Sequence, residues 1–134
     1  MREAVERGAR LETDIDLRVK SAFGAGPEDL LWCDGVIFGT PENFGYMSGA
    51  LKDFFERTYY ETREQLSNPA YALFVCGGSD GTGAVRSVER ILKGYPMKKV
   101  SAEIICLGPV SEEVLARCEE LGQGVAAGLC LGIF

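Results

Sequence analysis

The sequence contains no histidine among its 134 residues. This absence removes the usual general base, and with it Ser-His-Asp and Cys-His nucleophilic catalysis. The five cysteines form no C-x-x-C pair, so a typical zinc site has neither of its common ligand patterns. We therefore expect no metal site and no protein side chain that itself acts as the catalyst.

Basic residues and long apolar runs are also scarce. Fourteen Lys and Arg stand against twenty Asp and Glu, a net charge of -6, whereas nucleic acids and anionic membranes need a positive surface. No run approaches the roughly 18 apolar residues of a membrane span, and the first residues lack the apolar stretch of a signal peptide. The cysteines, odd in number and mostly in apolar surroundings, suggest core thiols in a reducing compartment. We expect a cytoplasmic protein that binds neither nucleic acid nor membrane.

Three short apolar runs dominate what is present. They cover residues 35–39, 71–76 and 102–107, and each is followed by a stretch with apolar residues at helical spacing. Continuous apolar strands that alternate with amphipathic helices predict βαβ units, and hence a parallel sheet covered on both faces. The length suits one core, so we expect a single α/β domain over residues 1–134.

The N-terminal part has a different pattern. Residues 1–9 predict a short helix, and residues 28–33 predict a short helix or turn. Residues 11–19 alternate apolar and polar side chains, which predicts a half-buried strand at a sheet edge. Ser48 and Ser111 are the expected N-caps of two later helices.

Two glycine-rich loops follow the first two apolar runs, at residues 40–49 (TPENFGYMSG) and 77–83 (GGSDGTG). In open α/β sheets, ligands bind outside the carboxyl ends of the strands. Glycines let a backbone approach a flat ligand, and Phe44, Tyr46 and Met47 suit an aromatic ring such as isoalloxazine. The alternative is structural: the aromatic side chains pin the loop against a neighbouring helix or subunit, and Asp80 caps a helix that begins near Thr82.

Residues 39–60, GTPENFGYMSGALKDFFERTYY, resemble one branch of the flavodoxin-like superfamily. This branch holds the NAD(P)H-dependent FMN reductases and the quinone oxidoreductases related to the Trp-repressor-binding protein. Its pattern is G-[ST]-P-x-x-[FL]-[GY]-x-[MI]-[ST]-[GA], followed by a helix with F-x-[DE]. The resemblance implies a three-layer α/β/α fold around a five-stranded parallel sheet of order 2-1-3-4-5, with residues 11–19 as the edge strand.

The resemblance also implies a cofactor, FMN, bound by the two loops. In these enzymes the flavin takes a hydride from NAD(P)H and passes electrons to a quinone, dye or other small acceptor, while the protein orients it. The family is often oligomeric, and we expect a homo-oligomer. The residues carried over as cofactor-binding are Thr40, Pro41, Glu42, Asn43, Phe44, Gly45, Tyr46, Met47, Gly77, Gly78, Ser79 and Asp80.

Two further functions stay open beside the reductase. A flavodoxin-type electron carrier would fit the low isoelectric point of about 4.7. Such carriers usually stack an aromatic side chain from the loop after the fourth strand, and residues 77–83 contain none, which favours the reductase. A cofactor-free scaffold protein is the other alternative.

The sequence departs from the family at its beginning, because residue 1 falls within what would be the first helix. The family's first strand and Ser/Thr-rich phosphate loop have no counterpart, so we expect an N-terminally truncated sheet of about four strands. An unfilled slot in the sheet would leave backbone groups without partners. A longer protein with an earlier start, pairing of residues 11–19 with residues 36–39, or a strand from another chain would each resolve this. We expect FMN binding to be weakened or lost without the phosphate loop.

Overall fold

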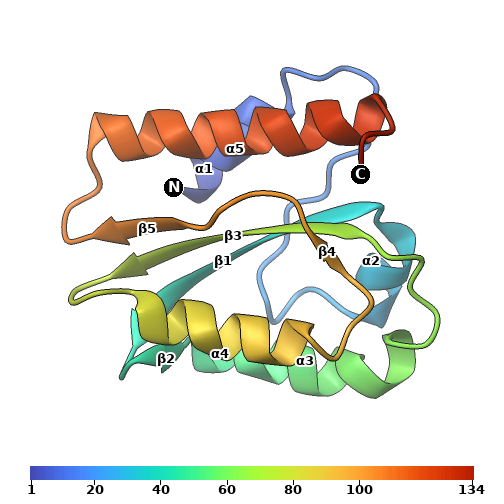
Figure 1. Ribbon diagram of the computed structural model, residues 1–134, viewed down its shortest axis with the longest axis horizontal. Helices are drawn as coiled ribbons and strands as arrows, with labels where there is room; N and C mark the ends of the chain where they lie inside the picture. The colour runs from blue at the N-terminus through green and yellow to red at the C-terminus, as the bar shows by residue number, and fades with distance from the viewer.

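The computed structural model describes residues 1–134 and places helices on both faces of one sheet (Figure 1). The short helix expected at residues 28–33 is present, as is the one expected at residues 1–9. In chain order the elements are α1 (Arg2–Ala9), α2 (Pro27–Trp32), β1 (Gly35–Asn43), β2 (Tyr46–Met47), α3 (Gly49–Thr62), β3 (Ala70–Gly77), α4 (Thr82–Leu92), β4 (Lys98–Lys99), β5 (Ile104–Leu107) and α5 (Glu112–Cys130).

The sheet is built on β3. On one edge β3 pairs in parallel with β1, from Gly35 opposite Ala70 to Pro41 opposite Cys76. On the other edge it pairs in parallel with two short strands, β4 near its start and β5 near its end. Only β2 is antiparallel, as the returning arm of a hairpin with β1. The sheet therefore has five strands and is mixed, whereas the sequence predicted a parallel sheet of about four strands. The carboxyl ends of β1, β3 and β5 therefore meet at one edge of the molecule.

Two apolar layers bury the faces of this sheet. On one face, α3 and α4 pack over a core that includes Phe38, Phe55 and Leu73. On the opposite face, α1 and α5 pack over a smaller core that includes Ala72 and Ile104. Both helices that follow a predicted serine N-cap have that cap: Ser48 Oγ accepts from the Leu51 N–H and Ser111 Oγ from the Val114 N–H. The predicted three-layer α/β/α arrangement is confirmed.

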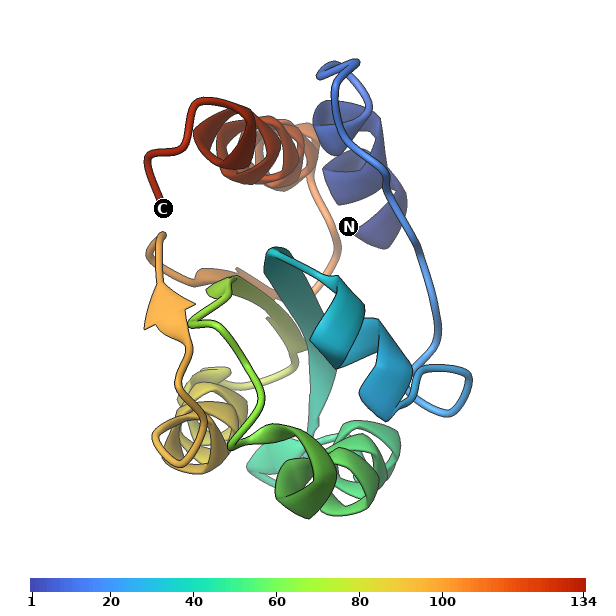
Figure 2. The ribbon, with the colours of Figure 1, turned by 90° about the vertical axis from the view of Figure 1, so that its right-hand side faces the viewer.

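The edge strand predicted at residues 11–19 is wrong. This part of the chain is extended, but it belongs to no strand and pairs with nothing. It does not close onto residues 36–39 either. Figure 2 shows it running outside β1, from the layer of α1 toward the layer of α3. Alternation of side chains describes which way they face, but a strand also needs a partner backbone within hydrogen-bonding distance.

The first predicted strand, in contrast, is longer than expected. It does not end at residue 39 but continues through Thr40 and Pro41 to Asn43, so the loop expected at residues 40–49 is mostly a β-hairpin. The hairpin carries the chain beyond the sheet edge before α3 begins. None of the helices is both long enough and apolar enough to cross a bilayer.

Candidate functional site

A tight hairpin turn stands at the carboxyl end of β1. Asn43 pairs with Tyr46, and the two residues between them, Phe44 and Gly45, have φ angles of +53° and +69°. This left-handed pair is the geometry of a type I′ turn, which matches the twist of the flanking strands. The side chain of Phe44 is fully exposed and Tyr46 is 42% exposed. The turn thus holds two aromatic rings on the surface, where they add nothing to the core.

The hairpin rests directly on the first turn of α4. A Cβ atom on Gly83 would lie 2.1 Å from the carbonyl oxygen of Gly45, so only glycine permits this approach. One turn later, the Ser87 hydroxyl accepts a hydrogen bond of 3.0 Å from the backbone N–H of Met47. These contacts fix the hairpin against the helix that follows β3. The two loops expected from the sequence are therefore neighbours.

Glu42 joins the two loops through its carboxylate. One oxygen, Oε1, accepts from the Ser79 hydroxyl at 3.2 Å and from the Gly81 N–H at 3.3 Å. The other, Oε2, accepts from the Ala84 N–H at 3.1 Å. A carboxylate at this place satisfies N–H groups that the first turn of a helix leaves free. The sequence interpretation placed Glu42 around a ligand; in the structure its carboxylate is directed at α4.

Asp80 caps the same helix from the other side. Its Oδ1 atom accepts hydrogen bonds of 2.7 Å from both the hydroxyl and the backbone N–H of Thr82. These two bonds lower the pKa of Asp80 below its usual value. The structural alternative for Asp80, a cap near Thr82, is therefore what the geometry shows. With Glu42 and Asp80 both in place, the N-terminus of α4 already carries two carboxylates, which leaves it unsuited to a phosphate group.

Several backbone N–H groups around these loops have no partner inside the protein. Gly78, Ser79 and Asp80 are consecutive exposed residues whose N–H groups donate no hydrogen bond, and the same holds for Phe44 and Gly45 in the turn. Nothing lies within 4 Å of the Cβ position of Gly45 or Gly78, so the space beside both is open. Free donors next to exposed aromatic rings can meet a ligand that is flat, with a polar edge.

The twelve residues predicted to bind a cofactor separate into two groups. Thr40, Met47 and Gly77 are buried: the Thr40 hydroxyl donates to the Pro41 carbonyl and accepts from the Ser48 N–H, and Met47 is part of the core. Glu42 is partly buried and occupied as described. The others lie exposed around the hairpin and the second loop: Pro41, Asn43, Phe44, Gly45, Tyr46, Gly78, Ser79 and Asp80.

A third loop at the same edge was missed from the sequence. Residues 108–111 follow β5, and the Gly108 N–H donates to the Gly77 carbonyl at 3.0 Å. Leu107 and Val110 are both exposed at this place. In the sequence, only the position of residues 108–111 after a predicted parallel strand could have placed them at the site, because every loop after such a strand lies at the same edge of the sheet. Below it, Cys76 and Cys106 are register neighbours on β3 and β5, and burial raises the pKa of the Cys106 thiol.

Comparison with known proteins identifies the family. Residues 11–108 match the family model described as NADPH-dependent FMN reductase. The chain belongs to this family. It is 29% identical over 142 residues to a protein named flavodoxin from Aquifex aeolicus, a match that covers 94% of this chain and 77% of the relative. The resemblance seen in residues 39–60 is confirmed.

Two further similarities agree with this placement. A protein of Acidithiobacillus ferrooxidans named NAD(P)H dehydrogenase (quinone) is 53% identical over 39 residues, which are 29% of this chain and 20% of that protein. A solved flavodoxin from the domain Archaea has a TM-score of 0.82 at 19% identity, over 96% of this chain and 87% of that chain. The predicted flavodoxin-like fold class is confirmed, and the relatives' names favour a flavin-binding oxidoreductase or a flavodoxin-like function.

Proposed function

We propose that this chain binds FMN between the hairpin turn and residues 78–80, and that it transfers electrons from NAD(P)H to a small acceptor such as a quinone. The observation that carries the proposal is the set of free N–H groups beside two exposed aromatic rings. This set lies at the carboxyl edge of the sheet, where α/β proteins bind ligands.

Each part of the site has a role in this proposal. Phe44 and Tyr46 cover one face of the ring, and the N–H groups of Gly78, Ser79 and Asp80 donate to its polar edge. The open Cβ positions of Gly45 and Gly78 allow the backbone to come close. Bound FMN supplies the chemistry of accepting a hydride and releasing electrons, which no side chain of this protein provides. The Glu42 carboxylate keeps the two loops at a fixed separation.

The phosphate of FMN is the part that these loops do not accommodate. The first turn of α4 is taken by Glu42 and Asp80, and a phosphate there would meet two negative charges. We therefore expect the isoalloxazine ring, and not the phosphate, to supply most of the binding free energy of FMN to residues 1–134. The dissociation constants for FMN and for riboflavin should then lie within about tenfold of each other, which is about 1.4 kcal/mol.

An electron carrier is the second candidate, favoured by the flavodoxin of Aquifex aeolicus that matches most of the chain. Residues 78–80 offer no aromatic ring to stack on the flavin, which favours the reductase. The two candidates differ in what they need. A reductase oxidises NAD(P)H alone with a dye or quinone, whereas a carrier requires a separate reductase to deliver electrons.

We also propose that the chain is one domain, that it works in the cytoplasm, and that it forms a homo-oligomer. Support for the oligomer comes from exposed aromatic surface such as Tyr60, which is 80% exposed on α3. Aromatic residues are enriched in subunit interfaces. Light scattering coupled to size exclusion measures the mass directly, and a mass of 14.6 kDa at all concentrations would contradict the proposal.

The decisive experiment is an absorbance spectrum of the purified protein from 300 to 550 nm, before and after addition of FMN and removal of free FMN. Riboflavin in a parallel sample tests whether the protein binds a flavin without phosphate about as strongly as it binds FMN. A retained flavin band, followed by NAD(P)H oxidation with a quinone, agrees with a reductase. A band without NAD(P)H oxidation favours the carrier. No binding of either flavin at millimolar concentration contradicts the site and favours a cofactor-free scaffold.

A further inference from the structure

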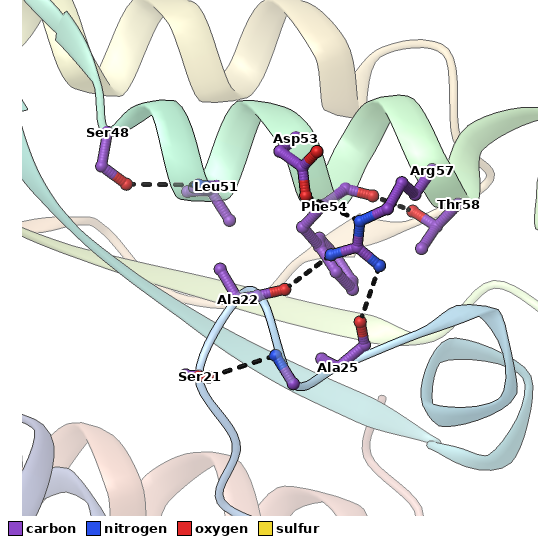
Figure 3. A network of polar contacts seen from close by, with 10 residues as sticks. Ser21, Ala22, Ala25, Ser48, Leu51, Asp53, Phe54, Arg57 and Thr58 are labelled. Atoms are coloured by element: carbon purple, nitrogen blue, oxygen red, sulfur yellow. Dashed lines mark hydrogen bonds and ion pairs between the residues drawn. The ribbon is translucent and has the colours of Figure 1, made fainter.

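Most basic side chains of this acidic chain are paired. Nine of the fourteen Lys and Arg form ion pairs with carboxylates. Arg57 of α3 is an example: its guanidinium binds Asp53 and also donates to the carbonyls of Ala22 and Ala25 (Figure 3). Because twenty Asp and Glu are present, cations without a partner are the exception.

Three of the five unpaired cations lie on one helix. Arg86, Arg90 and Lys93 are exposed, and none of them forms an ion pair. Their spacing of i, i+4 and i+7 places them on one side of α4 and its C-cap, over about 10 Å of the helix axis. These three residues are here called the basic stripe. The other two, Lys98 and Arg117, belong to β4 and α5.

The surroundings of the basic stripe offer little compensating charge. Residues 82–99 contain five Lys and Arg and one Glu, so this stretch has a net charge of +4 in a chain of -6. Its one carboxylate, Glu89, is bound to Lys99. On the neighbouring helix α3, Glu56 is bound to Lys52. The basic stripe is therefore positive surface whose cations are free to meet a partner.

The helix dipole explains only part of the basic stripe. Positive side chains near the carboxyl end of a helix are stabilised by the dipole, which accounts for Arg90 and Lys93. Arg86 stands in the second turn from the amino end, where the dipole gives a cation no stabilisation. The dipole of α4 therefore does not favour a cation at this position.

The basic stripe begins beside the candidate site. Ser87, the residue after Arg86, accepts a hydrogen bond from the Met47 N–H of the hairpin. The charge of Arg86 also contributes, after the hydrogen bonds from Thr82, to the lowered pKa of Asp80 in the second loop. A partner that covers the basic stripe therefore lies next to both loops, as a protein that exchanges electrons with a bound flavin must.

We propose that the basic stripe docks a protein partner through an acidic helix whose carboxylates follow the same spacing of i, i+4 and i+7. Such a helix, packed along α4, places one carboxylate near each of the three cations. An extended segment has side chains on one face only about every 6.7 Å, so it places two within the same 10 Å. Complementary charges of this kind set the orientation and the association rate of a complex. The proposal concerns the surface of α4 and does not rest on flavin binding.

Other partners fit the basic stripe less well. A two-fold contact between copies of this chain across the basic stripe would bring the three cations of one copy against those of the other. A nucleic acid duplex extends well beyond the roughly 10 Å of the basic stripe and would meet the acidic remainder of the chain. A short acidic helix avoids both conflicts.

The test uses two acetylated and amidated peptides of the same composition, AQAEAAQEAAEAQAAY and AQEAAAQEAAAQEAAY. As helices, the first has its three Glu on one side and the second has them spread around the axis. Amide shifts of the protein at low salt, followed up to millimolar peptide, report affinity and location together. We expect the first peptide to shift amides in residues 82–93 and to bind at least about threefold more tightly than the second. Raising the salt to about 0.2 M should weaken its binding, because salt screens exposed charges.

Charge variants separate the basic stripe from the overall charge of the protein. Arg90→Glu should weaken binding of the first peptide by about tenfold, because an attractive pair becomes a repulsive one. Arg90→Lys keeps the charge and should stay within about twofold of wild type. Arg117→Glu is the matched control, since it makes the same change in net charge at an exposed, unpaired cation of α5, and it should bind like wild type apart from the small effect of net charge.

Several outcomes would overturn the proposal. Equal binding of the two peptides, equal affinities of Arg90→Glu and Arg117→Glu, or no shift with either peptide would each remove the acidic helix as the partner. Tighter binding of a DNA duplex than of the first peptide would assign the basic stripe to nucleic acid instead. A dimer of the wild-type protein that Arg90→Glu abolishes, measured by light scattering, would assign it to a second copy.

Discussion

The Glu42 carboxylate at the end of β1 accepts a hydrogen bond of 3.1 Å from the Ala84 N–H in the first turn of α4. These residues are 42 positions apart in the chain. The same carboxylate also holds Ser79 and Gly81, so one side chain sets the separation of both loops of the candidate site. It is the contact on which the shape of that site most depends.

Replacing Glu42 should loosen both loops at once. For Glu42→Ala we expect a loss of about 1–2 kcal/mol in the free energy of unfolding, because the N–H groups of Gly81 and Ala84 lose a charged acceptor. Glu42→Gln keeps one acceptor oxygen and should lose less. Urea unfolding measures both, and FMN binding should weaken with either variant. Glu12→Ala, which removes a carboxylate with no hydrogen bond, is the control; equal losses for the two alanine variants would refute the role of Glu42.

The contact between Gly83 and the hairpin turn gives a steric prediction. In Gly83→Ala the new methyl group would meet the Gly45 carbonyl, a backbone atom, so the turn must move away from α4. We expect a loss of about 1–3 kcal/mol, typical of overpacking, together with shifted amide resonances of Phe44 and Tyr46. Gly49→Ala, at an open position in the first turn of α3, is the control and should be neutral or slightly stabilising. Unchanged amide resonances of Phe44 and Tyr46 in Gly83→Ala would contradict the contact.

Much of the fold could be predicted from the sequence. β3 is a continuous apolar run, as a strand buried on both faces requires, and α3 and α5 have apolar residues at helical spacing, as helices that cover a sheet require. The hairpin could not be predicted, since Pro41 looks like the end of a strand and a Phe-Gly turn lacks the usual Asn or Asp signal. The segment at residues 11–19 had the alternation of a strand, but no partner backbone reaches it. Burial of Thr40 and Met47 depends on contacts with α4 and α3, which local pattern does not contain. Sequence order thus predicted which loops meet, but not which of their side chains face outward.

The exposed turn makes a clean test of ligand binding. Phe44 is 108% exposed, so Phe44→Ala should leave the free energy of unfolding within about 0.5 kcal/mol of wild type. If its ring covers a flavin, the dissociation constant for FMN should rise by about tenfold, in the range expected for an aromatic contact of this size. Phe23, 72% exposed in the loop before α2, provides the matched control. Titration of flavin fluorescence measures both, and equal affinities for the two variants would remove Phe44 from the site.

The lowered pKa of Asp29 predicts how the free energy of unfolding depends on pH. Burial alone would raise the pKa of Asp29, but hydrogen bonds from Lys20 and the Gly26 N–H, with the charge of Arg18, lower it below the usual 3.8. A lowered pKa in the folded state means that the ionised group stabilises the fold at pH above its unfolded value. That contribution is lost as pH falls through the lowered pKa.

Asp29→Asn should therefore lose about 1–2 kcal/mol of stability at pH 7 and show a smaller further loss than wild type between pH 4 and pH 2. Urea unfolding across this pH range measures the difference. Asp53→Asn, which removes the exposed ion pair between Asp53 and Arg57, is the control and should cost less than 1 kcal/mol at pH 7. Because Asp29 forms ion pairs with Arg18 and Lys20, its variant should also speed cleavage by trypsin after these two residues. An unchanged cleavage rate there would mean that other contacts hold residues 13–20 beside β1.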